Sequence, residues 1–280
     1  MSQHIEFPCP IDRSPMQEIF QATILGKYEA TYFRCPTCRL MQPHPPIWLE
    51  ESYSAAIAKT DVGLIARNRN NWKRLEPLLH HMFPPEAKFL DVGGGYGLLC
   101  RGLRDDGYDC YTTDQYCPNL YAADFEPGPD FKADALLAFE VMEHIADPYD
   151  FVSGAFERYG CKTLIFSTLI HQGDEIPPMD WWYYAFETGQ HVSLYHQESL
   201  QMLAKKLGVE LWSLSDGLHV LSDRVPKGLG RHFLKPNRLG SAYGYYVSRS
   251  RRGLSKLQSD YEAAKAGVRQ LQSRGSSENK

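Results

Sequence analysis

The residues best suited to chemistry lie in a glycine-rich segment that follows a short apolar run. Asp91 ends that run at 89–91 and is followed by Gly93, Gly95 and Gly97. Residues without side chains at the end of a strand let the backbone turn sharply, and they let a ligand approach the main chain closely. A loop of this kind suits a nucleotide-like cofactor.

A carboxylate at the end of the next predicted strand supports this interpretation. Asp114 follows residues 108–113, and there it can accept hydrogen bonds from both ribose hydroxyls of a bound nucleoside. The dinucleotide fingerprint G-x-G-x-x-G fails, because its sixth position counted from Gly93 is Leu98 rather than Gly or Ala. A glycine-rich structural turn remains the alternative.

A second group of candidates lies in the aromatic segment 181–196. His191 is a candidate general base, because imidazole titrates near neutral pH. Tyr195 is the other candidate catalytic residue. Four successive aromatic residues suit stacking against a sugar or another ring: Trp181, Trp182, Tyr183 and Tyr184. The alternative is a hydrophobic cover packed on a sheet, with His191 as a structural histidine.

Strands must alternate with helices to position these residues. The predicted strands are 89–92, 108–113, 135–139 and 163–167, and the predicted helices are 97–106, 148–159 and 198–207. Such alternation is typical of an α/β fold with a mostly parallel sheet covered on both faces. We predict that segments 209–215 and 218–222 form a pair of antiparallel strands at the edge of this sheet. We therefore predict one cofactor-binding domain at 85–225.

Three further segments flank that domain. We predict that residues 1–46 form a small β-rich subdomain that contains cysteines. We predict that residues 47–84 form a helical segment that caps the cofactor site. Residues 226–280 predict a basic extension, helical near 257–271 and disordered at its end.

Two runs of sequence resemble a known family. Residues 89–97 (FLDVGGGYG) and 138–148 (AFEVMEHIADP) are similar to the first and fourth motifs of class I S-adenosylmethionine-dependent methyltransferases. Within that class they resemble the branch with ubiquinone-biosynthesis O-methyltransferases and sugar methyltransferases. The resemblance covers about residues 65–222. It implies a Rossmann-like, doubly wound, seven-stranded sheet with a reversed final hairpin.

The resemblance also implies a cofactor, S-adenosyl-L-methionine, and the residues that hold it. Asp124, within 123–125, would flank the adenine, and Glu143 and His144 would either hold a helix start or act in catalysis. The methionine moiety and the loop around it would be contacted by Asp91, Gly93, Gly95 and Gly97. Asp114 would bind the ribose, and Phe139 and Glu140 would lie beside the cofactor.

A finer resemblance is to sugar C-methyltransferases. In them the stretch that resembles 189–195 contributes a catalytic histidine, which matches His191, although Thr188 or Gly189 stands where a tyrosine is expected. Those enzymes also carry a zinc knuckle of four cysteines, and here the corresponding residues are Cys9, Asp12, Cys35 and Cys38. Carboxylate is an accepted zinc ligand, so structural zinc is a second expected cofactor. The alternatives are a knuckle that survives on packing alone and a redox motif, although no thioredoxin-like context surrounds the cysteine pair.

The composition excludes several other classes. The formal charge of −4 argues against a generalised grip on nucleic acid, although basic residues dominate after residue 224. That basic stretch is either a solvated face or a weak contact with phosphates or an anionic membrane surface. No run of eighteen apolar residues predicts a transmembrane helix, and nothing at the start marks export, so we expect a cytoplasmic protein with reduced cysteines.

Together these features predict a methyltransferase that acts on a small molecule. The preferred acceptor is a sugar, a nucleotide-sugar or a glycan-linked group, as in polysaccharide biosynthesis. Two alternatives stay open: an RNA methyltransferase that uses the cysteine knuckle and the basic tail, and a non-catalytic scaffold with the same fold.

Overall fold

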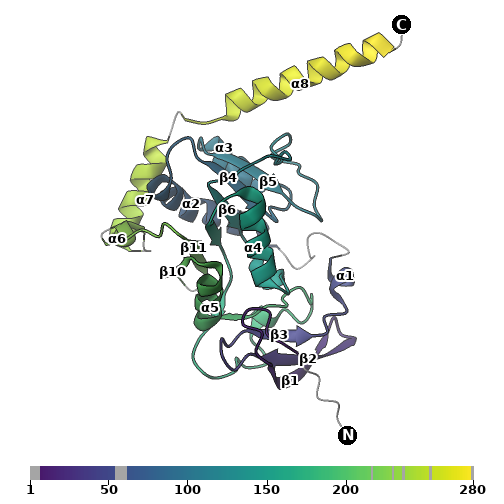
Figure 1. Cartoon of the computed structure of the whole chain (residues 1–280). Coiled ribbons are helices and arrows are strands. Elements are labelled where there is room, and N and C mark those ends of the chain that lie inside the picture. The colour runs from purple at the N-terminus through teal and green to yellow at the C-terminus, as the bar shows by residue number, and fades with distance from the viewer. Residues whose placement is uncertain are drawn as a thin grey trace.

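A six-stranded mixed sheet forms the centre of the molecule (Figure 1), in the order β10-β11-β7-β6-β4-β5. The computed structural model describes residues 7–53, 62–215, 217–228, 230–234, 237–251 and 254–278. Strands β5, β4, β6 and β7 run parallel to one another, whereas β11 pairs antiparallel with both β7 and β10. The strand bounds are β4 Lys88–Val92, β5 Asp109–Thr113, β6 Ala135–Ala138, β7 Thr163–Phe166, β10 Glu210–Ser215 and β11 Leu218–Ser222.

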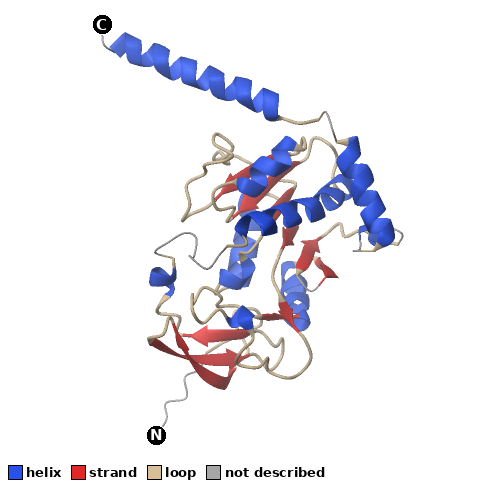
Figure 2. Ribbon diagram, turned by 180° about the vertical axis from the view of Figure 1, so that it is seen from behind, coloured by secondary structure: helices blue, strands red, loops and turns tan. Residues whose placement is uncertain are grey.

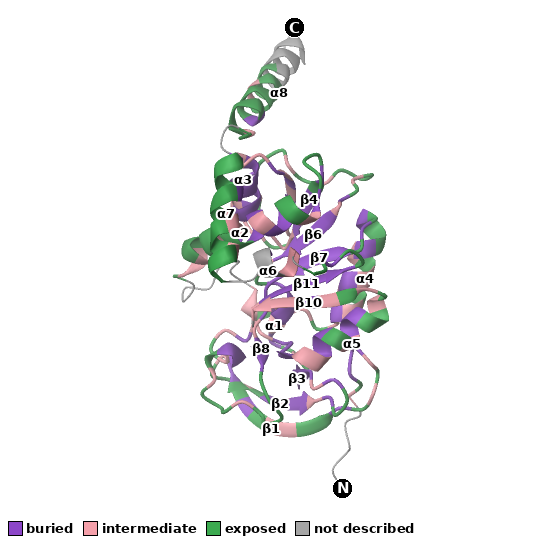
Figure 3. Cartoon of the chain, turned by 90° about the vertical axis from the view of Figure 1, so that its left-hand side faces the viewer, coloured by how far each residue is buried: buried purple, intermediate pink, exposed green. Residues whose placement is uncertain are grey.

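The burial of the central strands explains why these residues form strands here. Every residue of β6 and β7 is buried, as expected for parallel strands that helices cover on both faces. The covering helices are α3 (Leu98–Asp105), α4 (Pro148–Tyr159) and α5 (Gln197–Leu207). Figure 3 shows the buried residues concentrated in this sheet and in the faces of the helices on it. The predicted α/β fold with an antiparallel edge pair is confirmed.

Local signals set the bounds of α4. The side chain of Asp147 accepts a hydrogen bond from the backbone N–H of Asp150 at 3.0 Å, and Pro148 occupies the first turn. Gly160 ends the helix in the left-handed conformation, with φ of 69°. The observed helix therefore begins and ends where the sequence predicted.

The seventh strand that the family resemblance implied is missing, and this expectation was wrong. Residues 114–134, which the structure describes in full, contain turns and loops but no strand. Three prolines and a glycine in this segment remove or weaken backbone pairing: Pro118, Pro127, Gly128 and Pro129. One trace of pairing survives, because the N–H of Thr112 donates to the carbonyl of Phe125 at 2.9 Å.

The N-terminal segment forms a separate three-stranded antiparallel sheet, visible at the N-terminal end in Figure 2. Its strands are β1 Gln17–Ile24, β2 Tyr28–Arg34 and β3 Met41–His44. An antiparallel bridge joins Met41 to Leu194, and Trp48 donates to the carbonyl of Gly189 at 2.8 Å. This sheet therefore packs directly on the segment that holds the predicted acceptor residues. Two further short strands in that region, β8 (Ile170–His171) and β9 (Tyr195–His196), pair in parallel.

Two helices connect the small sheet to the central one. They are α1 (Leu49–Ser52) and α2 (Leu64–Met82), while residues 54–61 of the predicted helical segment lie outside the described residues. Helix α2 buries Leu75, Leu78 and Leu79 in the main core. The absence of a side chain at Gly102 of α3 leaves room for the ring of Trp72 of α2. The first turns of α2 are consequently held beside the carboxyl ends of the central strands.

The C-terminal extension forms three helices, α6 (Gly230–Leu234), α7 (Arg238–Ser250) and α8 (Leu257–Glu278). Helix α7 packs on α2, whereas α8 projects away from the body of the molecule (Figure 1). The last helix extends further than the predicted end near residue 271, and residues 273–278 are helical rather than disordered. Among the described helices, none is long and apolar enough to cross a membrane.

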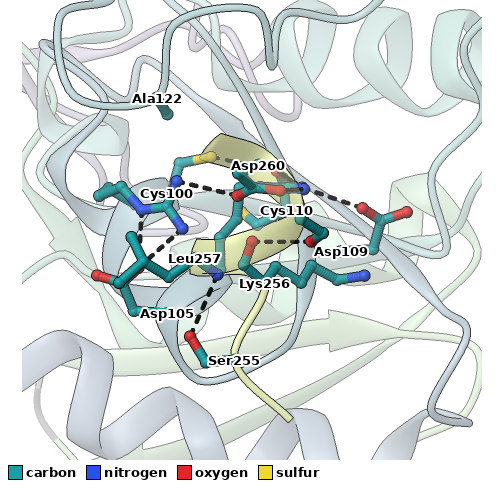
Figure 4. Close-up of polar contacts among 12 residues, drawn as sticks. Cys100, Asp105, Asp109, Cys110, Ala122, Ser255, Lys256, Leu257 and Asp260 are labelled. Atoms are coloured by element: carbon teal, nitrogen blue, oxygen red, sulfur yellow. Dashed lines mark hydrogen bonds and ion pairs between the residues drawn. The ribbon is translucent and has the colours of Figure 1, made fainter. Parts of the chain in front are cut away.

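A buried ion pair fixes the start of α8 to the main domain (Figure 4). Arg104 of α3 donates to both carboxylate oxygens of Asp260, at 2.8 and 2.7 Å. Arg104 also donates to the carboxylate of Asp109 and to the carbonyl of Cys110, each at 3.0 Å. Because only 4% of Arg104 is exposed, its charge depends on these partners.

We predict that Asp260→Asn lowers the free energy of unfolding by about 2 kcal/mol, because it leaves the Arg104 guanidinium with Asp109 as its remaining ion-pair partner. Urea denaturation followed by far-UV circular dichroism measures this effect. Glu262→Gln is the matched control, since Glu262 is exposed on the same helix. Equal stability of the two variants would contradict the prediction.

Candidate functional site

A large cleft opens at the carboxyl ends of β4, β5 and β6. Its volume is about 1710 Å³. A site for one small molecule is typically about 300–1000 Å³, so this cleft has room for two molecules. Its walls include the loops after the three strands, at residues 91–96, 113–117 and 139–141. They also include the first turns of α2, within 64–71, and two parts of the aromatic segment, at 182–183 and 190–191.

The glycine loop forms one end of the cleft. Gly93 and Gly95 have φ angles of 69° and 57°, in the left-handed region that favours glycine. A side chain at Gly93 would collide with Val141, whose Cγ2 would lie 2.8 Å from the added Cβ, whereas at Gly95 nothing lies within 4 Å. The main chain at Gly95 is therefore open to a ligand in the cleft.

Asp114 holds this loop in place. Its Oδ2 accepts from the N–H of Gly95 at 2.9 Å, and its Oδ1 accepts from the N–H groups of Tyr116 and Cys117 at 2.7 and 2.9 Å. The same carboxylate lines the cleft. The geometry thus brings Asp114 and the glycine loop together, as the sequence predicted.

Asp91 is the buried carboxylate beneath the loop. It is 1% exposed, and its Oδ2 has no hydrogen-bond partner among the described residues. Burial, with a smaller contribution from the charge of Asp114, raises the pKa of Asp91 to about 8. A cationic ligand group in the cleft would stabilise the ionised form of this carboxylate.

Two predicted cofactor residues do not line the cleft. Gly97 is the N-cap of α3 with a φ of 83°, and an added Cβ would collide with Asn119 and Ala122. Its role here is to let the helix start against a close neighbour. Asp124 is exposed in a turn with a φ of 72°, because the strand that would have aimed it at the adenine is absent.

Phe139 and Glu140 line the cleft where the sequence placed them. Glu140 has a φ of 58°, which is uncommon for a residue with a side chain. Ser167 holds this conformation, because its hydroxyl accepts from the N–H of Glu140 at 2.8 Å and donates to Oε1 at 2.9 Å. The other carboxylate oxygen, Oε2, lies 3.2 Å from Nε of Arg67 on α2.

His191 and His144 both line the cleft, with ring centroids 5.1 Å apart. Nδ1 of His191 is 2.7 Å from the carbonyl oxygen of Tyr183, and Nδ1 of His144 is 3.0 Å from that of Gln190. Since a carbonyl only accepts, each Nδ1 carries the proton and each Nε2 keeps a lone pair. Burial lowers the pKa of His191, and burial together with the charge of His191 lowers that of His144 to about 3.

Glu143 lies beside the two histidines in the short helix η1 (Met142–His144). It is 2% exposed, and burial, followed by the charge of Glu140, raises its pKa to about 8. Its Oε2 has no hydrogen-bond partner in the described part of the chain. The sequence left Glu143 and His144 between a structural and a catalytic role. The structure makes Glu143 a buried acidic group and places His144 on the cleft wall.

Half of the predicted aromatic platform faces the cleft. Trp182, which is 73% exposed, and the buried Tyr183 line it. Trp181 and Tyr184 instead pack with the N-terminal sheet, where Tyr184 contacts Phe20 and Tyr32. The structure therefore places these two predicted acceptor contacts in the core of the small sheet and not in the cleft.

Tyr195, the other predicted catalytic residue, does not line the cleft. It is fully buried, and its hydroxyl donates to the carbonyl of Met142 at 2.9 Å. That bond supports the short helix that carries Glu143 and His144. Gly189 is one of the two residues that stand where the resemblance leads one to expect a tyrosine, and the structure explains the glycine, because a side chain there would collide with Ile24 and Trp48.

Sequence reasoning missed two residues on the cleft wall, Tyr53 and Arg67. The rings of Tyr53 and Tyr116 stack with centroids 4.8 Å apart, and Tyr53 also contacts the ring of His144. These residues come from the segment before the central sheet. Only the folding of that segment over the strand ends brings them to the cleft, so local spacing gave no signal.

The predicted cysteine knuckle is assembled at the end of the N-terminal sheet. One ligand atom from each of Cys9, Asp12, Cys35 and Cys38 lies within 4.8 Å of the others. The Sγ atoms of Cys9 and Cys38 are 3.6 Å apart, and Cys35 Sγ is 3.5 Å from Asp12 Oδ2. All seven cysteines are free thiols. Zinc–thiolate bonds of about 2.3 Å in a tetrahedral site put sulfurs roughly 3.8 Å apart, so the donor set fits this metal.

The parallel sheet, the glycine loop at its carboxyl edge and the carboxylate after β5 define a class I methyltransferase fold. A family model described as a methyltransferase domain matches residues 65–214. The chain belongs to the methyltransferase domain family.

Solved structures with a similar fold include other methyltransferases. The calicheamicin-biosynthesis methyltransferase CalO1, in its SAH-bound form, is 13% identical, with a TM-score of 0.39 and coverage of 58% of each chain. The magnesium protoporphyrin IX methyltransferase ChlM from Synechocystis PCC 6803 is 14% identical, with a TM-score of 0.41 and coverage of 61% of this chain and 90% of its own. The pyocyanin biosynthetic protein PhzM is 16% identical, with a TM-score of 0.45 and coverage of 62% and 61%.

At these identities the likeness concerns the fold. The present chain spans less than two thirds of the length of CalO1 and of PhzM. None of the curated proteins matches the sequence.

Proposed function

We propose that this protein transfers the methyl group of S-adenosyl-L-methionine to an oxygen of a small molecule. The observation that carries the proposal is a single cleft that is lined by two chemically different groups of residues. One group is the glycine loop with Asp114, and the other is a pair of histidines with free Nε2 lone pairs. An enzyme of this kind must align donor and acceptor in line, and such positioning is the main source of its catalysis.

The cofactor end supplies groups for each part of S-adenosyl-L-methionine. Asp114 would accept hydrogen bonds from the ribose hydroxyls, and the open main chain at Gly95 would lie against the methionine moiety. The buried Asp91 would lie near the ammonium group of the methionine moiety. That positive group would supply the partner that Asp91 Oδ2 lacks among the described residues. Phe139 and Glu140 would lie along the side of the cofactor.

At the acceptor end, His191 would take the proton from the acceptor hydroxyl at Nε2. The oxygen then forms a bond to the methyl carbon while the carbon–sulfur bond breaks. The electron pair of that bond stays on sulfur, and S-adenosylhomocysteine leaves as a neutral thioether. The lowered pKa of His191 keeps it unprotonated, as a base requires, at neutral pH.

The lining of the acceptor end favours a ring-bearing acceptor with polar substituents. Trp182 offers an exposed indole, and the stacked rings of Tyr53 and Tyr116 lie nearby on the same cleft wall. Such surfaces stack on sugar or aromatic rings. Within this class we prefer a sugar, a nucleotide-sugar or a glycan-linked acceptor.

A panel of nucleotide-sugars and phenols, incubated with the enzyme and S-adenosyl-L-methionine, tests the acceptor class. The readout is S-adenosylhomocysteine formed in excess of an acceptor-free control. We expect turnover with at least one nucleotide-sugar. If only phenols are methylated, the proposal of methyl transfer stands and the preference for a sugar acceptor is wrong.

We further propose that the cysteine knuckle binds one structural zinc ion through Cys9, Asp12, Cys35 and Cys38. Elemental analysis of the purified protein should then find about one zinc per chain, and Cys35→Ser combined with Cys38→Ser should remove it. Cys117→Ser is the control, since this cysteine lies outside the cluster. A folded protein without zinc would show that packing alone holds the knuckle.

A further inference from the structure

The acceptor end of the cleft contains a second group of metal-ligand residues, separate from the cysteine knuckle. Glu143, His144 and His191 each present one ligand atom, and these atoms all lie within 4.8 Å of one another. Ligands around one cation are roughly 3 to 4 Å apart when each bond is about 2.1 Å long. Closing the group around an ion therefore needs movements of an ångström or less.

The two histidines are prepared as metal ligands. Backbone carbonyls of Tyr183 and Gln190 accept from their Nδ1–H groups, at 2.7 and 3.0 Å, and this fixes both tautomers with Nε2 unprotonated. Histidines that bind metals in proteins are usually oriented in this way, by a hydrogen bond from the other ring nitrogen.

Glu143 supplies the third, oxygen ligand. Its side chain is almost fully buried, yet Oε2 has no hydrogen-bond partner among the residues that the structure describes. A buried carboxylate oxygen without a partner is costly, and a bound cation would satisfy it.

We propose that Glu143, His144 and His191 bind one divalent transition-metal cation at the acceptor end of the cleft. Two imidazoles and one carboxylate favour ions such as Mn²⁺, Fe²⁺, Co²⁺ or Zn²⁺ over Ca²⁺ and Mg²⁺, which prefer oxygen ligands alone. Three protein ligands leave coordination positions open for an acceptor oxygen.

This inference rests on the proposed function and specifies how the acceptor is activated. A hydroxyl bound to the cation would lose its proton more readily, and Nε2 of His191 would then be a ligand, so the proton would pass to water. Proton removal by His191 itself, as proposed above, would apply to the protein without the ion. The oxygen keeps its electron pair and forms the bond to the methyl carbon, and the sulfur receives the pair of the broken carbon–sulfur bond. An acceptor with two neighbouring oxygens, such as a vicinal diol or a catechol, would fill the open positions best.

Titration with Mn²⁺, followed by the loss of the free-ion signal in electron paramagnetic resonance, tests the proposal. Mn²⁺ prefers oxygen and nitrogen ligands to thiolates, so the cysteine knuckle does not compete for it. We expect one bound ion per wild-type chain. Glu143→Gln and His191→Gln should each weaken binding at least tenfold, while His80→Gln, at an exposed histidine of α2, should bind like wild type.

Two controls keep the outcome clear. Circular dichroism shows whether each variant is folded, and His191→Gln decides the matter if Glu143→Gln does not fold. S-adenosylhomocysteine binding is measured in parallel on the same samples. Wild type that binds the nucleoside but no Mn²⁺, or that binds Mn²⁺ no better than folded His191→Gln, would overturn the metal site and leave the proposed methyl transfer intact.

Discussion

Asp114→Ala should weaken binding of S-adenosylhomocysteine roughly 100-fold or more. In the proposed binding mode the carboxylate accepts two ribose hydroxyl groups, and in the structure it accepts from the N–H of Gly95 at 2.9 Å. Hydrogen bonds to a charged group contribute about 1.5–3 kcal/mol each, and every 1.4 kcal/mol is about tenfold in affinity. Isothermal titration calorimetry measures the change directly.

Two asparagine substitutions separate the loop from the ligand. Asp114→Asn keeps an acceptor oxygen for the N–H groups of Tyr116 and Cys117, so the turn should persist while ribose binding weakens. Asp124→Asn is the matched control, because Asp124 is exposed outside the cleft and asparagine tolerates its positive φ. Equal affinities in all three proteins would show that the ribose does not bind at Asp114.

His191→Ala should lower kcat by roughly 100- to 10,000-fold while S-adenosylhomocysteine binds as in wild type. The reason is that, among the described residues, the hydrogen bond and ring contacts of His191 are with Tyr183 and His144 and not with the glycine loop or Asp114, whether it removes a proton or holds a metal. Steady-state assay of S-adenosylhomocysteine production gives kcat, and calorimetry gives the affinity. Loss of nucleoside binding in this variant would place His191 at the cofactor instead.

The pH dependence of this reaction follows from the lowered pKa of His191. A base must be unprotonated, so activity is lost as pH falls through its pKa, and burial puts that pKa below the usual 6.5. We therefore expect the loss of kcat/KM that protonation of His191 causes to lie below pH 6.5. Tyr195→Phe is the control for a residue that only supports the site. It should lower stability by about 1 kcal/mol and leave the pH profile unchanged.

The sequence predicted the central sheet well because its signals are local. Apolar runs that are buried on both faces, as in β6 and β7, have no other stable placement, and Asp147, Pro148 and Gly160 set the bounds of α4. The glycine loop and Asp114 were likewise predictable, because parallel strands bring their carboxyl ends to the same edge.

The residues that were misplaced depend on contacts between distant segments. Trp181, Tyr184 and Tyr195 look like their neighbours in sequence, yet the small N-terminal sheet and the short helix η1 take their side chains out of the cleft. Asp124 was placed by analogy on a strand that this chain does not form. Arg67 and Tyr53 enter the cleft only because the segment that carries them folds back over the strand ends.

The role of the C-terminal extension is also clearer from the structure. Its basic residues were expected to form a solvated face or to contact phosphates, and the acidic Asp260 anchors the last helix through Arg104 instead. The helix beyond that anchor projects away from the body of the molecule (Figure 1), and none of its described residues lines the cleft.

The central claim is that the cleft at the glycine loop binds the methyl donor. A thermal-shift titration of the purified chain with S-adenosylhomocysteine tests it most directly. Saturating ligand at about 100 times its Kd stabilises the folded state by about 2.7 kcal/mol, which corresponds to a rise in Tm of roughly 5 °C that Asp114→Ala should abolish. An unchanged Tm at saturating concentrations of both S-adenosylhomocysteine and S-adenosyl-L-methionine would contradict the account.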